Sequence, residues 1–305
     1  MLKLVIDTDP GVDDAMALFF AMLHKDIELL GLTTIFGNVT QDKAVRNALV
    51  LGDIAGQDIP VARGADKPSV IPPNPPADFV HGQEGFGDLP AFTPKRSPDP
   101  RTAAQFIVDT ANAHQGELVL CPVGPLTNIA TALELDPELP SKVKQVVIMG
   151  GGVERGNVTP YAEANVWNDP HAADKVFAAN WPMRMIGLNV TMDTVCSKAM
   201  LEATREAAPK LGGFLCDAAD FYMRFYGEAY GIDGCQMHDP AALVACVAPE
   251  LFTYKDIALE VSCQGETIGQ TRPSKASGRR SVQVAMQVDS DRVNALFLDT
   301  IKTGF

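Results

Sequence analysis

The sequence lacks the features that place a protein in a membrane or on a nucleic acid. No apolar run in its 305 residues approaches the roughly 18 residues that span a bilayer, and no signal peptide precedes the first apolar segment. Lysine and arginine form no cluster, and the formal net charge is −13, the wrong sign for nucleic acid or an anionic membrane surface. We therefore expect a soluble protein that binds neither, and whose partner is a cation or a small neutral molecule.

Cysteine is also sparse, and none of the six residues forms a CxxC pair. Several lie in apolar segments, where a free thiol packs as a small hydrophobic side chain. Reduced thiols are typical of the cytoplasm, so we expect a cytoplasmic protein. The six residues are Cys121, Cys196, Cys216, Cys235, Cys246 and Cys263.

Apolar strands alternate with helical segments over the first two thirds of the chain. This pattern is typical of an α/β fold with an open, doubly wound, mainly parallel sheet of Rossmann type. Residues 66–100 are rich in Pro, Gly and Asp and are expected to form a long loop. The expected strands cover residues 2–8, 27–36, 59–63, 118–123, 143–149 and 183–190, and the expected helices cover 13–24, 41–56, 102–114, 126–135 and 169–179.

After residue 190 the pattern changes. No linker and no internal repeat divides the sequence, so we expect one domain over residues 1–305, with its active site at the carboxyl ends of the strands. Three further helices are expected at 198–207, 213–230 and 239–247, followed by a small antiparallel addition near the C-terminus with strands 257–263, 266–271 and 281–288, and by a closing helix at 291–303.

Four aspartates crowd the segment between the first expected strand and the first expected helix: Asp7, Asp9, Asp13 and Asp14. Ligands of open α/β sheets bind outside the carboxyl ends of the strands, which is where this segment lies. Four like charges repel one another unless a cation neutralises them or a carboxylate holds a proton. A turn followed by a helix start explains one or two of these aspartates, but not all four.

Polar residues also follow the other expected strands, and a parallel sheet would bring them to the same edge. They supply oxygen ligands without a Cys or His pair, which favours a hard cation, Ca²⁺ or Mg²⁺. The EF-hand pattern fails, because its sixth and twelfth positions are Val12 and Leu18. A cation site built from distant segments favours a hydrolase, because a metal can activate a water beside a carboxylate base. The carboxylates and carboxamides favour a polyhydroxylated ligand such as a sugar. The residues are Asn38, 124–128, Asn157, Glu163, Asn165 and 238–240.

These motifs, in their order along nearly the whole chain, resemble the inosine-uridine-preferring nucleoside hydrolase family. The amino-terminal Asp-Thr-Asp-Pro-Gly-Val-Asp-Asp-Ala motif, residues 7–15, is the most specific of them. The resemblance implies hydrolysis of the N-glycosidic bond of ribonucleosides to free base and ribose, as in purine and pyrimidine salvage, by a homo-oligomer that is a tetramer or a dimer. The further motifs lie at 33–40, 80–85, 124–128, 147–151, 156–157, 162–165 with 169–170, and 238–240.

The resemblance also assigns roles to residues. Ca²⁺ would be held by Asp9, Asp14, Asp239 and the main-chain carbonyl of Thr127, and Asp9 would take the proton from a calcium-bound water. His238 would assist departure of the base. The substrate would be bound by Asp13 at the ribose 2′-hydroxyl, by Asn38, which also positions the attacking water, by Met149 against the sugar, and by Asn157, Glu163 and Asn165 at the ribose hydroxyls.

Several positions near the base keep two interpretations. His81 either contacts the base or lies on the surface. The aromatic residues of 221–230 fall at helical spacing, which is typical of a core, yet in the family this region can close over the base, so that Tyr226 or Tyr230 would stack on it. The sequence does not fix the preference between purines and pyrimidines.

Three further positions concern support and sugar preference. Asp7 is expected to orient its neighbours, and Asn128 is expected either to belong to the site or only to start a helix. Ala164 stands where the family commonly has an aromatic residue, and Trp167, three residues on, is the candidate to compensate. The sugar preference is therefore open.

Two other functions are compatible with parts of the pattern. A Mg²⁺-dependent phosphatase of the haloacid dehalogenase type also has Asp-x-Asp after its first strand, but Asp13 and Asp14 would add negative charge where a phosphate binds. A ribosyl-binding calcium protein without turnover is the second alternative. Asp9 and His238, as a base and an acid, argue against it.

Overall fold

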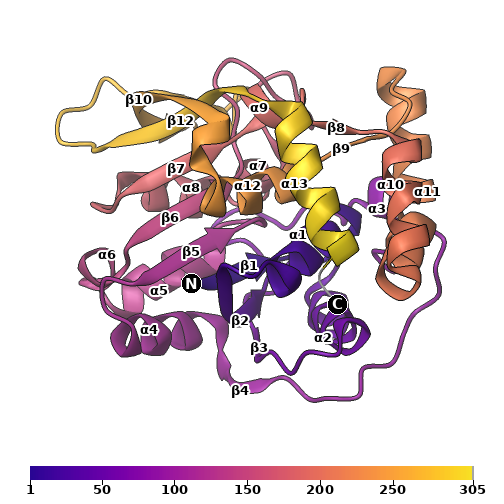
Figure 1. Cartoon of the computed structure of the whole chain (residues 1–305). Coiled ribbons are helices and arrows are strands. Elements are labelled where there is room, and N and C mark those ends of the chain that lie inside the picture. Colours follow the sequence, from indigo (N-terminus) through magenta and orange to yellow (C-terminus); the bar gives the residue numbers. More distant parts are fainter. Residues whose placement is uncertain (304–305) are drawn as a thin grey trace.

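A ten-stranded sheet forms the centre of the protein, whose computed structural model describes residues 1–303 (Figure 1). All neighbours from β12 to β4 are parallel, whereas β10 and β11 run antiparallel at one edge. This confirms the expected fold class, with the antiparallel addition extending the main sheet. In spatial order the strands are β11 (Thr271–Pro273), β10 (Phe252–Val261), β12 (Ser281–Val288), β7 (Met183–Ile186), β6 (Gln145–Met149), β5 (Leu118–Pro122), β1 (Leu2–Thr8), β2 (Ile27–Thr34), β3 (Val61–Arg63) and β4 (Asp99–Thr102).

Alternate side chains of the strands are buried against helices on the two faces of the sheet. Leu4 and Ile6 of β1 belong to the core on one face, and Val5 between them belongs to the core on the other, as the period of two in a strand requires. Helices α1 (Val12–Leu23), α2 (Gln41–Ala55), α10 (Lys198–Ala207), α11 (Pro209–Tyr230), α12 (His238–Val247) and α13 (Ser290–Thr303) pack into the first core, and α4 (Ala103–Ala113), α5 (Thr127–Leu135) and α8 (Pro170–Ala178) into the second (Figure 1).

The register of β1 decides where a site can form. Asp7 pairs with Thr33 of β2 on one side and with Pro122 of β5 on the other. Because the three strands run in the same direction, their carboxyl ends emerge together at one edge of the sheet. The loops after these strands therefore meet at that edge.

The expected strand 183–190 is half helix. β7 ends at Ile186, and the short helix α9 (Leu188–Thr191) follows directly. Gly187 permits this close turn, because a Cβ there would collide with the main-chain carbonyl of Gly151. The apolar run alone could not distinguish the two conformations, since short apolar runs fit a buried strand or a buried helix equally well.

The expected loop 66–100 and the expected strand 266–271 are also partly wrong. The loop contains the helix α3 (Asp78–His81) and ends in the edge strand β4, and most of 266–271 forms turns that lead into β11. Short elements carry too little periodicity to be predicted. Five more were missed: α6 (Leu139–Lys142), α7 (Ala164–Asn168), β8 (Val195–Cys196), β9 (Cys235–Gln236) and the short 3-10 helix η1 (Pro249–Leu251). Across residues 1–303, every helix is too short or too polar to cross a bilayer.

Candidate active site

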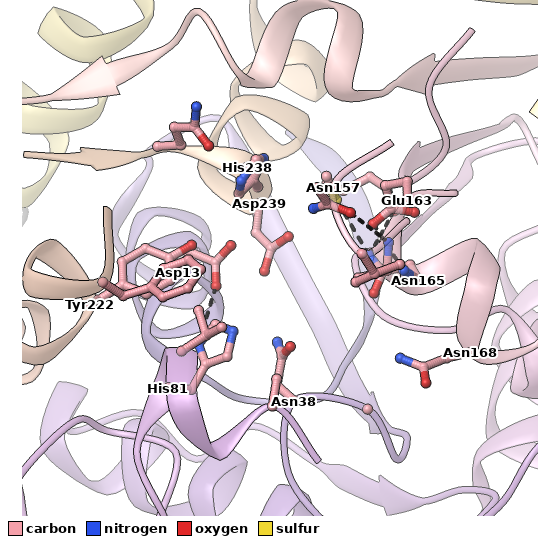
Figure 2. A pocket seen from close by; sticks show the side chains of 18 of the residues that line it. Asp13, Asn38, His81, Asn157, Glu163, Asn165, Asn168, Tyr222, His238 and Asp239 are labelled. Carbon is pink, nitrogen blue, oxygen red and sulfur yellow. Dashed lines mark hydrogen bonds and ion pairs between the residues drawn. The ribbon is translucent and has the colours of Figure 1, made fainter. Parts of the chain in front are cut away.

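A cavity of about 440 Å³ opens at the carboxyl ends of the strands (Figure 2). Its size lies within the range of about 300–1,000 Å³ that is usual for small-molecule sites. Three predicted site residues, Asp9, Asp14 and Thr127, are buried just outside its lining. The predicted residues that line it are Asp13, Asn38, His81, Met149, Asn157, Glu163, Asn165, Tyr226, Tyr230, His238 and Asp239.

Asp14 is held rigidly in the first turn of α1. Its Oδ1 accepts a hydrogen bond from Thr8 Oγ1 at 2.5 Å, and its Oδ2 accepts bonds from Gly11 N at 2.9 Å and from Asn38 Nδ2 at 3.0 Å. The carboxylate is fully buried, and burial raises its pKa despite these donors. The side-chain and main-chain donors therefore fix the direction in which Asp14 presents its charge.

Asp9 is held by one oxygen only. Its Oδ2 accepts the main-chain N–H of Asn38 at 2.6 Å, and its Oδ1 is buried with no hydrogen-bond partner within residues 1–303. Gly37 and Gly124 lie so close to this carboxylate that a Cβ on either would collide with it. Burial, and secondly the charge of Asp14, hold the pKa of Asp9 well above its usual range.

Three carboxylates converge from two distant parts of the chain. Asp13 and Asp14 come from α1, Asp239 comes from the first turn of α12, and one oxygen of each lies within 4.8 Å of the others. Burial raises the pKa of Asp13 to about 8 and, together with the charges of Asp13 and Asp14, raises that of Asp239 well above its usual range. This triad contains Asp13 where the sequence analysis expected Asp9.

These residues fit a hard cation. All ligand atoms in reach are oxygens, which suits Ca²⁺ or Mg²⁺. Asp9 Oδ1 and Asp13 Oδ1 are both buried without a partner in the described chain, and buried anionic oxygens are costly unless a donor or a cation meets them. The mutual repulsion of the carboxylates also favours a bound cation, which would neutralise them.

Asp169, which the sequence analysis did not select, joins three parts of the site. It accepts hydrogen bonds from Thr127 Oγ1 at 2.8 Å and from Ser69 N and Oγ at 2.7 and 2.9 Å, and it caps α8 through Ala172 N at 3.0 Å. Asp169 thereby fixes the start of α5, where Thr127 lies, to the long loop. An aspartate before a proline at a helix start is a recognisable capping signal, but its link to Thr127 is visible only in the fold.

Asp7 and Asn128 take supporting positions. Asp7 Oδ1 accepts bonds from Thr33 Oγ1 at 2.5 Å and from Asn128 Nδ2 at 2.8 Å. Asn128 also donates to the Thr34 carbonyl at 2.9 Å and accepts from Ala65 N at 2.9 Å. Neither side chain lines the cavity. Both tie neighbouring strand ends together, as expected for Asp7, and Asn128 also lies in the first turn of α5.

A second polar group lies across the cavity from the aspartates. Glu163 caps α7 and accepts bonds from the main-chain N–H groups of Gly151 at 2.8 Å and Asn165 at 2.9 Å. Asn157 Oδ1 accepts the N–H of Ala164 at 3.1 Å. Burial raises the pKa of Glu163 although these donors oppose the shift. Figure 2 shows Asn157, Glu163 and Asn165 grouped together, facing Asp13 and Asp239 across the cavity.

His238 lies in a line of hydrogen bonds at the other end of the cavity. Its Nδ1 is 2.8 Å from Thr191 Oγ1, its Nε2 is 2.9 Å from the Tyr226 hydroxyl, and that hydroxyl is 3.2 Å from the Tyr222 hydroxyl. Burial lowers the pKa of His238 to about 4. Tyr222 and Thr191 were not selected from the sequence, because aromatic and threonine residues at helical positions are usually core.

His81 lies in the site and not on the surface. Its ring stacks on Tyr222, with centroids 5.2 Å apart, and its Nδ1 accepts the N–H of Val12 at 3.2 Å and lies 3.8 Å from Asp13 Oδ1. Burial lowers its pKa to about 3. The helix α3 within the long loop places this ring against α1 and α11.

The rim of the cavity is aromatic. Tyr230 stacks on Tyr226 with centroids 5.6 Å apart and is 43% exposed, and Phe79 and Phe225 meet edge to face at 5.8 Å. All four line the cavity. Trp167 and Ala164 line it too, so the tryptophan borders the space beside the small side chain.

Comparisons with known proteins agree with this geometry. The model of the family described as "Inosine-uridine preferring nucleoside hydrolase" matches residues 4–295. A probable uridine nucleosidase 2 of Arabidopsis thaliana is 39% identical, over 98% of this chain and 97% of that protein. The inosine-uridine preferring nucleoside hydrolase of Leishmania major is 36% identical, over 98% and 97%. The solved structure of a plant nucleoside hydrolase superposes with a TM-score of 0.95 at 38% identity, covering 99% of both chains.

Proposed function

The chain belongs to the inosine-uridine preferring nucleoside hydrolase family and is an N-ribohydrolase that acts on ribonucleosides, and we propose that it does so with Ca²⁺ held at the aspartate cluster. The observation that carries this proposal is the convergence of Asp13, Asp14 and Asp239 beside the unpartnered Oδ1 of Asp9. The products are the free base and ribose.

The proposed ligands of the cation are carboxylates and one carbonyl. Asp9, Asp14 and Asp239 offer the carboxylate oxygens, and Thr127 offers its main-chain carbonyl. When bound, such a cation lowers the pKa of a water among its ligands. The Thr127 carbonyl, in the first turn of α5, also accepts a hydrogen bond from Thr131 Oγ1 at 2.8 Å.

Asp9 is proposed as the base that accepts the proton of the attacking water. Its Oδ2 is occupied by Asn38 N, so its Oδ1 is the free acceptor. Asn38 donates its side-chain amide to Asp14 and turns its carbonyl oxygen toward the cavity that it lines, where it would orient the water. Attack from the aspartate side of the ribose predicts inversion at the anomeric carbon.

Ribose is proposed to lie between the two polar groups. Asp13 would accept from the 2′-hydroxyl, Met149 would pack against the ring, and Asn157, Glu163 and Asn165 would bind the remaining hydroxyls. The transition state of glycosidic cleavage carries positive charge on the ribose. Carboxylates and carboxamides placed around the ring in advance stabilise that charge.

The departing base is proposed to receive a hydrogen bond or proton from the Tyr226 and His238 pair. Both ring nitrogens of His238 are engaged, one by Thr191 and the other by Tyr226. Tyr226 is therefore the group through which His238 would reach the base. His81, stacked on Tyr222, and Tyr230 at the rim would contact the base from its sides.

The alternatives are weaker. No lysine or arginine of residues 1–303 lines the cavity, so a phosphate would find no positive side chain there to offset the negative aspartates, which argues against a phosphatase. A silent binding protein is inconsistent with the enzyme family to which the chain belongs.

The cellular setting is part of the proposal. A cytoplasmic location is supported by the acidic composition and the free cysteines, and a dimeric or tetrameric assembly and a role in salvage are supported by family membership.

The direct test measures reducing sugar released from inosine, adenosine, guanosine, uridine and cytidine, with and without a calcium chelator. We expect ribose to appear without added phosphate and to disappear on thorough chelation, and Ca²⁺ to restore it. Turnover that survives chelation would overturn the metal assignment. Release from none of the five by the folded, calcium-loaded protein would overturn the proposed activity.

A further inference from the structure

Gln236 lies in the cavity at the end where His238 and Tyr226 lie, and the proposed mechanism leaves it unused. It belongs to β9, two residues before His238, and pairs with Val195 of β8. It lines the cavity together with Tyr230, although its side chain is only 2% exposed. A buried amide that faces a cavity must find hydrogen-bond partners there or in the protein.

One half of this amide is already fixed. Gln236 Nε2 donates to the main-chain carbonyl of Met192 at 3.0 Å. A carbonyl can only accept, so the nitrogen must face Met192 and the oxygen must face the other way. No hydrogen-bond partner of Oε1 occurs among the described residues, and Gln236 lines the cavity. Gln236 therefore presents a fixed acceptor to the cavity.

The position of Gln236 Oε1 in the cavity determines which part of a bound nucleoside it can contact. Figure 2 shows Tyr222 and Asp13 on one side of the cavity and Asn157 and Glu163 on the other, and hydrogen bonds through Tyr226 join His238 to the Tyr222 side. The proposed function places ribose between the aspartates and Asn157, which leaves the end beside His238 for the base. An acceptor at this end meets an edge of the base.

We propose that Gln236 recognises the base. Its Oε1 accepts a hydrogen bond from the ring N–H on the edge of the base remote from the ribose. Uracil carries such a donor at N3 and hypoxanthine at N1, whereas cytosine and adenine carry a lone pair at the same positions. Gln236 thus makes the enzyme selective for lactam bases of both ring sizes. This inference rests on the proposed function, because that function sets the direction of the nucleoside.

The physical basis of selection is the cost of an unmade hydrogen bond. A lone pair facing Oε1 would leave both acceptors buried without a donor, which costs more than the bond itself contributes. Sites that hydrogen-bond a substrate N–H reject analogues without it for this reason. We expect a loss of about tenfold or more in kcat/KM for bases without the donor.

The test compares uridine with 3-methyluridine and inosine with 1-methylinosine, in which a methyl group replaces the donor hydrogen. Wild-type protein should cleave each parent at least tenfold more efficiently. In Gln236→Met, a side chain of similar length without an acceptor, kcat/KM of the parents should fall about tenfold while that of the methylated nucleosides should not, so that the ratio approaches one.

A matched control is Gln41→Met. Gln41 is also buried and donates through Nε2 to a main-chain carbonyl, that of Thr34 at 3.1 Å, but it lies outside the cavity lining. Its discrimination between parent and methylated nucleosides should match that of wild type. A purely structural role of Gln236 would lower all rates together and leave the ratio unchanged.

Three results would overturn the inference. Equal rates for parent and methylated nucleosides in wild type would show that the protein does not recognise the ring N–H of the base. An unchanged ratio in Gln236→Met would show that the methyl group is excluded by its size alone. A selective loss on adenosine or cytidine would show that Gln236 accepts from an exocyclic amine. Failure of the proposed function would look different, because no nucleoside of either set would release ribose.

Discussion

The main-chain N–H of Asn38 lies 2.6 Å from Oδ2 of Asp9 and leaves Oδ1 of the same carboxylate without a partner. The two oxygens of Asp9 are thus different from each other before any ligand binds. One holds the carboxylate in place, and the other is free to accept a proton. This asymmetry motivates the first prediction.

Asp9→Asn should remove most of the turnover and retain nucleoside binding. The amide keeps the size of the side chain but is a poor proton acceptor, so kcat should fall by about 10²–10⁴-fold, the usual contribution of a general base. Rates are measured by ribose release and binding by calorimetry at a fixed, saturating calcium concentration. A variant with a near wild-type kcat would show that Asp9 is not the base.

Tyr226→Phe should impair cleavage of nucleosides with poor leaving groups. The change removes the hydroxyl that links His238 to the cavity and keeps the ring. We expect kcat/KM on inosine and uridine to fall by about 10²-fold, with little change on a nitrophenyl riboside, whose leaving group needs no proton.

His238→Ala should show the same selectivity. Tyr254→Phe is the matched control, since Tyr254 also has a buried hydroxyl but lies on β10, away from the cavity. An equal loss on the activated riboside in both site variants would argue for a structural role of this pair.

Without calcium, the protein should become less stable as pH rises. The pKa of Asp13 is raised from 3.8 to about 8 in the folded chain, chiefly by burial. The folded state therefore binds more protons than the unfolded state between these values, so the free energy of unfolding falls as pH rises through that window.

Calcium should weaken this dependence of stability on pH, because a cation stabilises the charged carboxylates. Thermal unfolding between pH 5 and 8 should show a falling Tm in chelator and a higher, flatter Tm with calcium. Identical profiles in the two conditions would contradict a cation at the aspartate cluster.

Asp169→Asn should weaken cation binding, although Asp169 is not proposed as a ligand. The substitution disturbs a buried carboxylate that accepts from Thr127, Ser69 and Ala172, at a cost of about 1–3 kcal/mol. Loosening the start of α5 should displace the Thr127 carbonyl and raise the Kd for calcium, measured by calorimetry.

A comparison with Asp174→Asn separates the loss of stability from the weaker binding of calcium. Asp174 also accepts a main-chain N–H, that of Val261, and pairs with Arg279, but it lies outside the cavity lining. Its substitution should lower stability without changing the Kd. If both variants bind calcium as tightly as wild type, Asp169 has no role in positioning the ligand.

Much of this fold follows from local patterns in the sequence. β1 and β12 lie where they were expected, and the boundaries of α1 and α2 differ from the expected ones by a residue, because long periodic segments and flanking turn residues specify them. α9 was misassigned, since the apolar run 183–190 has no period that separates strand from helix.

The site was less predictable than the fold. The aspartates and Glu163 stand next to strand ends or helix starts, where their types are informative, and they were identified. Tyr222 and Thr191 were not, because their roles depend on tertiary contacts: Thr191 bonds to His238, and Tyr222 bonds to Tyr226, which in turn bonds to His238. The lowered pKa values of His81 and His238 are also tertiary effects, since both come from burial.

The carboxylates of the triad come from distant parts of the chain, Asp13 and Asp14 from the first helix and Asp239 from α12. During synthesis, a ribosome-bound chain exposes the first two long before the third exists. A tight cation site can therefore form only after β1, β5 and α12 have come together. Calcium would therefore bind late in folding, after most of the chain has been made. Nascent or truncated chains that lack α12 would not retain it.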